Sequence, residues 1–182
     1  MKFNPSVWEV LFYFFSHPYE EVYLRELARK ANVSVFSAKQ AVDELVKEKV
    51  LLERKNGNMR YIRANMESLF FRQLKIAFSI KKIEESGLIP YLVGNIPAIS
   101  SIVLFGSIAK GEDDENSDVD LLVIGQKKRM DLSKFEKKMG REIKIIIMKW
   151  SEWREHVKKD KALYREIITN GIVLYGGMPV VE

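Results

Sequence analysis

Two aspartates, Asp118 and Asp120, stand one residue apart at the start of an apolar run that is typical of a buried strand. Because alternate residues of a strand point to the same face, both carboxylates are expected on one face, with their Cα atoms about 7 Å apart. Two carboxylates at this separation repel each other, so they need water or a cation between them. Mg²⁺ and similar hard cations prefer oxygen ligands, including those of phosphates. The pair therefore indicates a site for a divalent cation and a phosphate.

A glycine and a serine, Gly106 and Ser107, precede the aspartates by ten intervening residues. Gly106 allows a sharp backbone turn and a close approach to a ligand, and Ser107 offers a hydroxyl and an N–H group. A helical turn that begins here would point backbone donors at an anion. The acidic run 112–115 lacks the ligand spacing of an EF-hand calcium loop, and we expect it to be solvated.

Together, Gly106-Ser107, Lys110-Gly111, Ser117 and Asp118-Val119-Asp120 closely resemble the signature of minimal nucleotidyltransferase domains, which are relatives of the DNA polymerase beta superfamily. The resemblance covers about residues 98–176. It implies transfer of a nucleoside monophosphate from a nucleoside triphosphate to an acceptor hydroxyl. Asp118 and Asp120 would be the catalytic residues and would hold Mg²⁺ or Mn²⁺, while Gly106, Ser107 and Lys110 would bind the nucleotide. Some minimal nucleotidyltransferases are antitoxins that transfer AMP to a partner toxin, so a protein acceptor is one implied partner.

Active members of this family usually carry a third carboxylate on a later strand, and the matching position here is Lys144. An ammonium beside Asp118 and Asp120 would neutralise them as a metal ion does, and it would repel a second divalent cation. A general base, which often contributes about 10²–10⁴-fold in rate, would also be lost. Two alternatives stay open: Lys144 points away and pairs with surface acids, or Glu142 takes the role in a strand register shifted by about 7 Å.

The elements around these residues alternate between strands and helices. Apolar runs bounded by turn signals predict the strands, and amphipathic spacing predicts the helices. The predicted order is strand 101–105, a glycine turn, strand 119–124, helix 132–139, strand 142–148, helix 152–169 and strand 172–175. This order indicates a small domain with one mixed sheet.

The N-terminal third has a different organisation. Helical spacing starts near residue 6, and two further helices with a short turn between them are expected within residues 23–51, the second capped by Ser34. Asn56-Gly57 predicts a β-hairpin over residues 51–63. Helices followed by such a hairpin resemble a winged helix-turn-helix domain, although Lys49 stands where a glycine often ends the second helix.

The winged-helix resemblance implies that the helix 34–47 enters the major groove of double-stranded DNA. The implied DNA contacts are Ser37, Lys39 and Gln40 on this helix and Arg54, Lys55, Arg60 and Arg63 on the hairpin. The charge excess is small, because residues 1–65 carry eleven Lys or Arg and eight Asp or Glu. A solvated surface on a protein-binding domain is therefore the alternative.

A long helix is expected over residues 66–86, ended by Gly87, and Pro90 and Pro97 should break up the segment that follows. We expect a winged helix domain at 1–65, a connecting helix and linker at 66–90 and a nucleotidyltransferase-like domain at 91–182. The fold class is α+β or mixed α/β, with a helix-rich winged helix domain before a small mixed-sheet domain. The apolar surface of the 66–86 helix would pack between the domains or form the seam of a homodimer.

The composition agrees with a globular protein: of 182 residues, 47% are hydrophobic and 30% are charged, with a net charge of +5. The absence of cysteine excludes disulfides and thiolate metal sites. No apolar run reaches the ~20 residues of a membrane span, so we expect a cytoplasmic protein with no membrane partner. Two function classes stay open. One is a metal-dependent nucleotidyltransferase that a DNA-binding winged helix docks to its acceptor. The other is a DNA-binding transcription regulator whose transferase domain is inactive and serves as a nucleotide sensor or dimerisation module.

Overall fold

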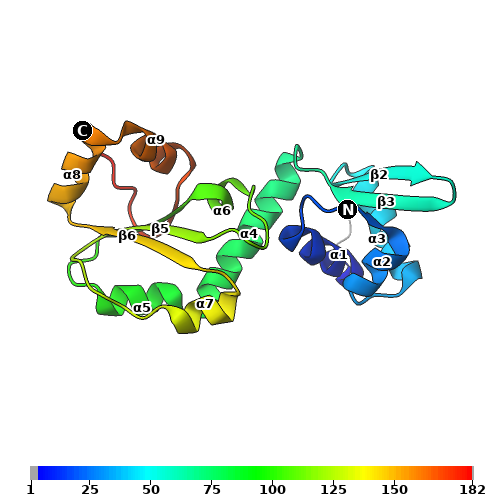
Figure 1. Cartoon of the computed structure of the whole chain (residues 1–182), viewed down its shortest axis with the longest axis horizontal. Coiled ribbons are helices and arrows are strands. Elements are labelled where there is room, and N and C mark those ends of the chain that lie inside the picture. Colours follow the sequence, from blue (N-terminus) through cyan, green and yellow to red (C-terminus); the bar gives the residue numbers. More distant parts are fainter. Residues whose placement is uncertain (1–3, 182) are drawn as a thin grey trace. The chain divides into compact units, whose positions relative to one another are not determined.

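The computed structural model describes residues 4–181, which divide into two compact units. Unit 1 runs to Lys75 and also includes the short segment Asp113–Glu115, while the remaining residues belong to unit 2. The division falls inside helix α4 (Leu69–Ser86), which Figure 1 labels together with other elements of both units. No helix of the described chain combines the length and the apolar character that crossing a bilayer requires.

Three helices form the core of unit 1 because each presents apolar residues at helical spacing on one face. Val7, Val10, Leu11 and Phe14 are all fully buried. Ser34 caps the third helix as predicted, since its hydroxyl accepts a hydrogen bond from the backbone N–H of Ser37 at 3.0 Å. The helices are α1 (Pro5–Ser16), α2 (Leu24–Lys30) and α3 (Val35–Lys47).

Unit 1 also contains a three-stranded antiparallel sheet in the order β1-β3-β2. The predicted hairpin is present, but Asn56 pairs with Met59, so Gly57 and Asn58 make the turn. At the end of α3, Lys49 has a φ of 58°, the left-handed conformation for which glycine is preferred. The two-residue strand β1 has no signal in the sequence. The strands are β1 (Val22–Tyr23), β2 (Leu51–Asn56) and β3 (Met59–Ala64).

Unit 2 is built on a four-stranded sheet in the order β6-β5-β4-β7. Strand β4 is antiparallel to β5 and β7, whereas β5 and β6 are parallel. Figure 1 shows α5 and α7 on one side of this sheet and α8 and α9 on the other. The elements are α5 (Leu88–Asn95), β4 (Ser101–Phe105), α6 (Gly106–Lys110), β5 (Val119–Ile124), α7 (Ser133–Met139), β6 (Ile143–Met148), α8 (Trp150–Lys159), α9 (Lys161–Asn170) and β7 (Ile172–Gly176).

Apolar residues fill both faces of the sheet. This explains why polar and apolar residues do not simply alternate along its central strands. Leu104 and Leu121 belong to a cluster on one face, and Val103 and Leu122 belong to a cluster on the other, together with Trp153. All five side chains are fully buried. The sheet therefore rigidly supports the end of β4, which precedes Gly106, and the start of β5, which carries Asp120.

Two predictions for unit 2 are wrong in detail. The single helix expected over 152–169 is divided at Asp160, whose backbone is not helical and whose carboxylate caps α9 by accepting from Leu163 N at 2.9 Å. Pro90 does not interrupt the helical structure, because it lies in the first turn of α5. There its missing N–H would have had no intrahelical partner.

The acidic run is solvated only in part, since Glu112 and Glu115 are exposed but Asp113 is buried. Asp113 is only 1% exposed and forms an ion pair with Lys75, which is fully buried. The ammonium of Lys75 also donates to the backbone oxygen of Asp113. Two residues on, Glu115 lies 2.6 Å from the Nδ1 atom of His17. This part of the loop thus packs in unit 1.

Candidate functional site

Asp118 and Asp120 lie where strand β5 begins. Asp118 directly precedes the strand, and Asp120 pairs laterally with Phe105 at the end of β4. Val119 between them is 1% exposed, so the two aspartates point to the opposite face, where the Asp118 side chain is 26% exposed. The end of one strand and the start of its neighbour therefore bring the aspartates to the glycine turn.

Gly106 follows Phe105 and lies directly against Asp120. Its φ is 75°, a left-handed value that favours glycine. A Cβ atom at this position would be 2.4 Å from Oδ2 of Asp120, which is closer than any real contact. The approach of the backbone to this carboxylate therefore requires a residue without a side chain.

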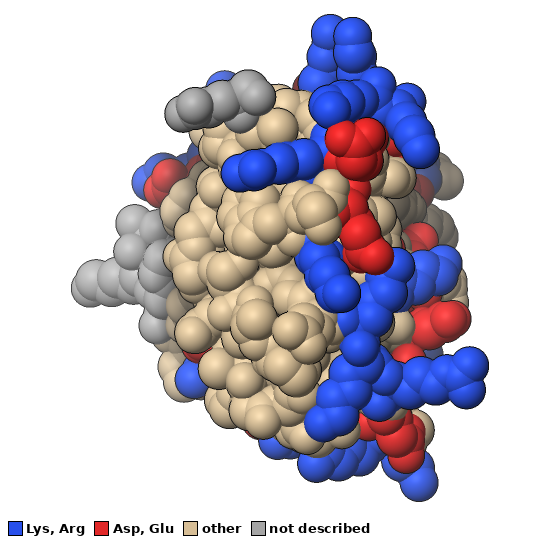
Figure 2. All heavy atoms as spheres, turned by 90° about the vertical axis from the view of Figure 1, so that its left-hand side faces the viewer, with Lys and Arg blue, Asp and Glu red and all other residues tan. Residues whose placement is uncertain are grey.

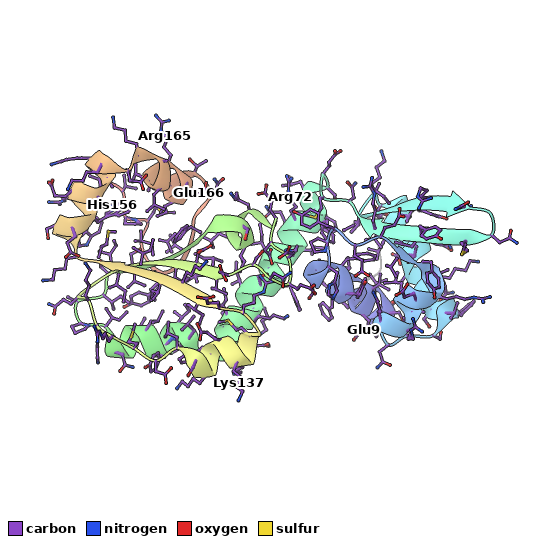
Figure 3. The ribbon with its side chains drawn as sticks, viewed as in Figure 1. Glu9, Arg72, Lys137, His156, Arg165 and Glu166 are labelled. Carbon is purple, nitrogen blue, oxygen red and sulfur yellow. The ribbon has the colours of Figure 1, made fainter. Side chains whose placement is uncertain are left out.

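The other two predicted nucleotide-binding residues lie in the short helix α6 that starts at Gly106. Ser107 is partly exposed beside the glycine. Lys110, at the end of the helix, has its ammonium 3.2 Å from the Oε1 atom of Glu166 and 3.9 Å from Glu112. Figure 3 shows Glu166 projecting from α9. Ser107 thus directly follows the glycine that lies against Asp120, whereas Lys110 is engaged with acids of unit 2.

Lys144 stands beside the two aspartates, on the edge strand of the sheet. In the parallel register of β5 and β6, Lys144 pairs with Asp120, and its ammonium lies 2.5 Å from Oδ2 of Asp118. The hydrogen bond and the charge of Asp118 raise the pKa of Lys144. The alternative in which Lys144 points away from the aspartates is therefore wrong. Glu142 precedes β6 and is exposed.

The two carboxylates have different surroundings. Asp118 is paired with Lys144, whereas Asp120 has no ion pair within residues 4–181. Burial, followed by the negative charge of Asp118, raises the pKa of Asp120, and the charge of Lys144 acts in the opposite direction. Asp120 is thus a partly desolvated carboxylate without a cationic partner in an ion pair within the described residues.

Arg141, which was not among the residues predicted from the sequence, adds a second cation near the site. Its guanidinium donates to the backbone oxygen of Ser117 at 3.3 Å, next to Asp118. Arg141 lies in the turn before β6, 24 residues from Ser117 along the chain. The sequence shows a basic residue there but has no local signal for its partner.

Asp118 and Asp120 are the residues of this site that could hold Mg²⁺ or Mn²⁺. Asp118 and Asp120 supply carboxylate oxygens, and Mg²⁺ is commonly held by one or two carboxylates together with phosphate oxygens and water. Across the described chain, no cluster of three or more His, Cys, Asp or Glu side chains has the geometry for a metal ion. The protein therefore offers an ion two carboxylates, and a phosphate would have to supply further ligands.

The cations that we predicted for a DNA surface in unit 1 are not equally available. Arg60 is bound to Glu53 and Asp43, and its side chain is only 18% exposed. Arg54 forms two hydrogen bonds with Glu21, at 2.6 and 3.2 Å, and lies over the ring of Tyr61. Half of the hairpin's four cations are thus engaged with acids.

The remaining predicted contacts are more accessible. Lys39, Lys55 and Arg63 are exposed and form no ion pair within the part of the chain that the structure describes. Gln40 is exposed, while Ser37 is partly exposed and contacts Ser34. Two apolar neighbours on α3 are also exposed, Phe36 by 69% and Val35 by 48%. The exposed part of α3 therefore combines polar, cationic and apolar side chains.

A protein family model matches the part of the chain that contains the glycine turn and the two aspartates. The family model described as Polymerase beta, Nucleotidyltransferase matches residues 86–177, about half of the chain. Two solved structures are similar to 51% of the chain. One is a mutant of the toxin–antitoxin pair MntA-HpeT (22% identity, TM-score 0.36, 72% of that chain covered). The other is a toxin–antitoxin with AMP-PNP (23% identity, TM-score 0.37, 73% covered). No curated protein matches the chain.

Proposed function

This chain belongs to the polymerase beta nucleotidyltransferase family, and on that premise we propose that unit 2 transfers a nucleoside monophosphate from a nucleoside triphosphate to an acceptor hydroxyl. The observation that carries the proposal is the contact between the backbone of Gly106 and the carboxylate of Asp120. A phosphate chain held at the glycine turn would lie beside the two carboxylates, which is the arrangement that phosphoryl chemistry with a divalent cation needs.

In the proposed reaction, the acceptor oxygen bonds to the α-phosphorus while the bond from that phosphorus to the oxygen bridging to the β-phosphate breaks. Pyrophosphate leaves, and the proton of the acceptor hydroxyl passes to water. Gly106 allows the phosphate chain to approach the backbone, and Ser107 offers its N–H and hydroxyl as donors. Asp118 and Asp120 would hold Mg²⁺ or Mn²⁺, and the ion would draw negative charge away from the phosphate oxygens.

The position of the label distinguishes this reaction from other phosphoryl transfers. The full chain is incubated with Mg²⁺ or Mn²⁺ and a nucleoside triphosphate labelled at either the α- or the γ-phosphate. DNA, RNA and protein extracts are supplied as sources of acceptor hydroxyls. We expect α-label to appear on one class of acceptor and γ-label to leave as pyrophosphate. Transfer of γ-label would contradict the proposal. So would a failure of all four common nucleotides to transfer any label.

Substituting Gly106 tests the contact with Asp120. We expect Gly106→Ala to lower the affinity for a nucleoside triphosphate at least about tenfold, because the new Cβ atom displaces the carboxylate. It should also cost about 1–2 kcal/mol in the free energy of unfolding, because alanine is strained at a positive φ. Gly140→Ala is the matched control: Gly140 has a φ of 70° but nothing within 4 Å of the added atom. Calorimetric nucleotide binding and urea denaturation separate the two effects. Equal loss of nucleotide affinity in both variants would contradict the role of the contact.

For unit 1 we propose a winged helix domain that binds double-stranded DNA and brings unit 2 to its site of action. The three helices, the two-stranded hairpin and the exposed face of α3 support this proposal. The accessible cations Lys39, Lys55 and Arg63 are the contacts that phosphates would use. Protein binding through Phe36 is the competing use of the same helix, because a 69% exposed phenyl ring favours an apolar partner.

The ion pairs of the hairpin predict unequal effects on DNA binding. Arg63→Ala should weaken binding and lower the slope of log affinity against log salt by about 1, because one phosphate contact is lost. Arg60→Ala should leave the slope unchanged, since Arg60 already binds Glu53 and Asp43. Fluorescence anisotropy with duplex DNA at several salt concentrations measures both slopes. Salt-independent binding, or a larger slope change for Arg60, would argue against this assignment.

A second candidate function is a regulator that binds the nucleotide without transferring any part of it. The ion pair between Lys144 and Asp118 favours this candidate, because it occupies one of the two carboxylates. Nucleotide binding would then change the affinity of unit 1 for DNA. Stoichiometric nucleotide binding with no α-label transfer would select the regulator, whereas catalytic label transfer would select the enzyme.

A further inference from the structure

The ion pair of Lys144 and Asp118 places a permanent positive charge inside the candidate site. The ammonium is 2.5 Å from Oδ2 of Asp118, and Lys144 pairs with Asp120 across the parallel strands β5 and β6. All three residues therefore meet at one edge of the sheet. The negative charge of Asp120 is left without an ion pair among residues 4–181.

The charges at this edge set how many divalent cations it can attract. Two carboxylates and one ammonium have a net charge of −1, and the flanking Arg141 and Glu142 carry opposite charges. One divalent ion changes the sum to +1, a sign that attracts a triphosphate. A second divalent ion would have to approach the ammonium of Lys144 and would find Asp118 already paired.

We propose that Lys144 is the resident cation of this site and that the site binds one divalent ion with the nucleoside triphosphate. The inference rests on the nucleotide binding of the proposed function. Asp120 is the main protein ligand of the single ion, because it is the carboxylate without a cationic partner. Lys144 supplies the second positive charge from the edge strand and stays beside Asp118 when the nucleotide binds.

The competing explanation is that the contact is an ordinary surface ion pair. The Lys144 side chain is 58% exposed, and ion pairs of exposed groups contribute little to stability. In that case a divalent ion would displace the ammonium from Asp118, and two ions would bind beside the nucleotide as in two-metal sites. The number of bound ions therefore distinguishes the two explanations.

Manganese provides a direct count of the ions. Two Mn²⁺ ions about 4 Å apart, the separation in two-metal sites, give a spin-coupled paramagnetic resonance spectrum, whereas a single ion gives an uncoupled one. The full chain is titrated with Mn²⁺ in the presence of saturating AMP-PNP and without any added acceptor, because AMP-PNP keeps the α–β bridging oxygen at which the proposed reaction breaks the phosphate chain. Equilibrium dialysis, with nucleotide in both compartments, gives the number of ions bound per chain. For the natural chain we expect one bound ion and no coupled spectrum.

Two substitutions test whether Lys144 sets the number of divalent ions that the site binds. Lys144→Asp should bind two ions and show the coupled spectrum. Lys144→Met removes the charge without adding a ligand, so it should bind its first ion about tenfold more tightly. Lys127→Asp is the matched control, because Lys127 is 66% exposed and pairs with Glu152 elsewhere in unit 2. It should leave the count and the affinity unchanged.

The outcomes separate this inference from the function on which it rests. A coupled spectrum in the natural chain, or a single ion in Lys144→Asp, would overturn the inference and leave the proposed nucleotide binding intact. A natural chain that binds neither AMP-PNP nor Mn²⁺ would overturn both. Circular dichroism of each variant confirms that the exposed substitutions leave the fold unchanged.

Discussion

Replacing Asp120 by asparagine is expected to lower the rate of nucleoside monophosphate transfer by about 10²–10³-fold or more. The substitution keeps the size of the side chain but removes the charge of the one site carboxylate that has no ion pair in the described chain. A divalent ion would lose its main protein ligand, and the phosphate oxygens would lose the charge stabilisation that the ion provides. Asp118→Asn should also reduce the rate, and it should in addition release Lys144 from its ion pair.

The measurement is the rate of α-label transfer at saturating nucleotide, combined with the affinity for Mn²⁺ in the presence of AMP-PNP. Glu155→Gln is a suitable control, because it makes the same chemical change at a carboxylate of α8 that is 63% exposed and pairs with Lys158. Its rate should stay within about twofold of the natural chain. If Asp120→Asn kept full activity, or if Glu155→Gln lost as much, the assignment of the site to Asp118 and Asp120 would be wrong.

Replacing Lys75 by methionine is expected to cost about 3–5 kcal/mol in the free energy of unfolding. Lys75 is fully buried and Asp113 is 1% exposed, and the two form an ion pair within unit 1. Without the ammonium, the carboxylate of Asp113 would remain in a poorly solvated position without its cation. The cost comes from this uncompensated charge more than from the lost attraction.

A second substitution separates the two contributions. Lys75→Met combined with Asp113→Asn should recover a large part of the loss, because the buried group is then neutral. Lys81→Met is the control on the same helix, since Lys81 is 63% exposed and pairs with Glu85 at 3.3 Å. It should change the free energy by less than about 1 kcal/mol. Urea denaturation measures all three variants, and a cost below 1 kcal/mol for Lys75→Met would contradict this account.

The buried pair also shows why the burial of Asp113, within the acidic run 112–115, could not be predicted from the sequence. Four consecutive acids normally indicate a solvated loop, because isolated carboxylates are costly to bury. Lys75 offsets this cost for Asp113 by forming an ion pair with it, and Lys75 lies 38 positions away in the chain. No local pattern connects a lysine inside an amphipathic helix with an aspartate in a distant loop.

Local signals in the sequence were enough to predict most elements of both units. The cap at Ser34, the hairpin near Gly57 and the apolar strands β4 and β5 depend on interactions between residues close in the chain. The same signals failed where two local rules competed. Pro90 is a helix breaker in most positions, but the first turn of a helix tolerates it. Asp160 interrupts an amphipathic run because its side chain caps a new helix.

The sequence by itself determined which residues could form a phosphate and cation site, because Gly106, Ser107, Asp118 and Asp120 have spacings that a turn and a strand convert directly into proximity. Only the tertiary structure decided what surrounds them. The parallel register of β5 and β6 puts Lys144 against Asp118, and packing between distant segments engages Arg60 and Lys110 with acids. The physical reason is that strand register and long-range ion pairs depend on how whole elements pack. The chain's local preferences leave that packing open.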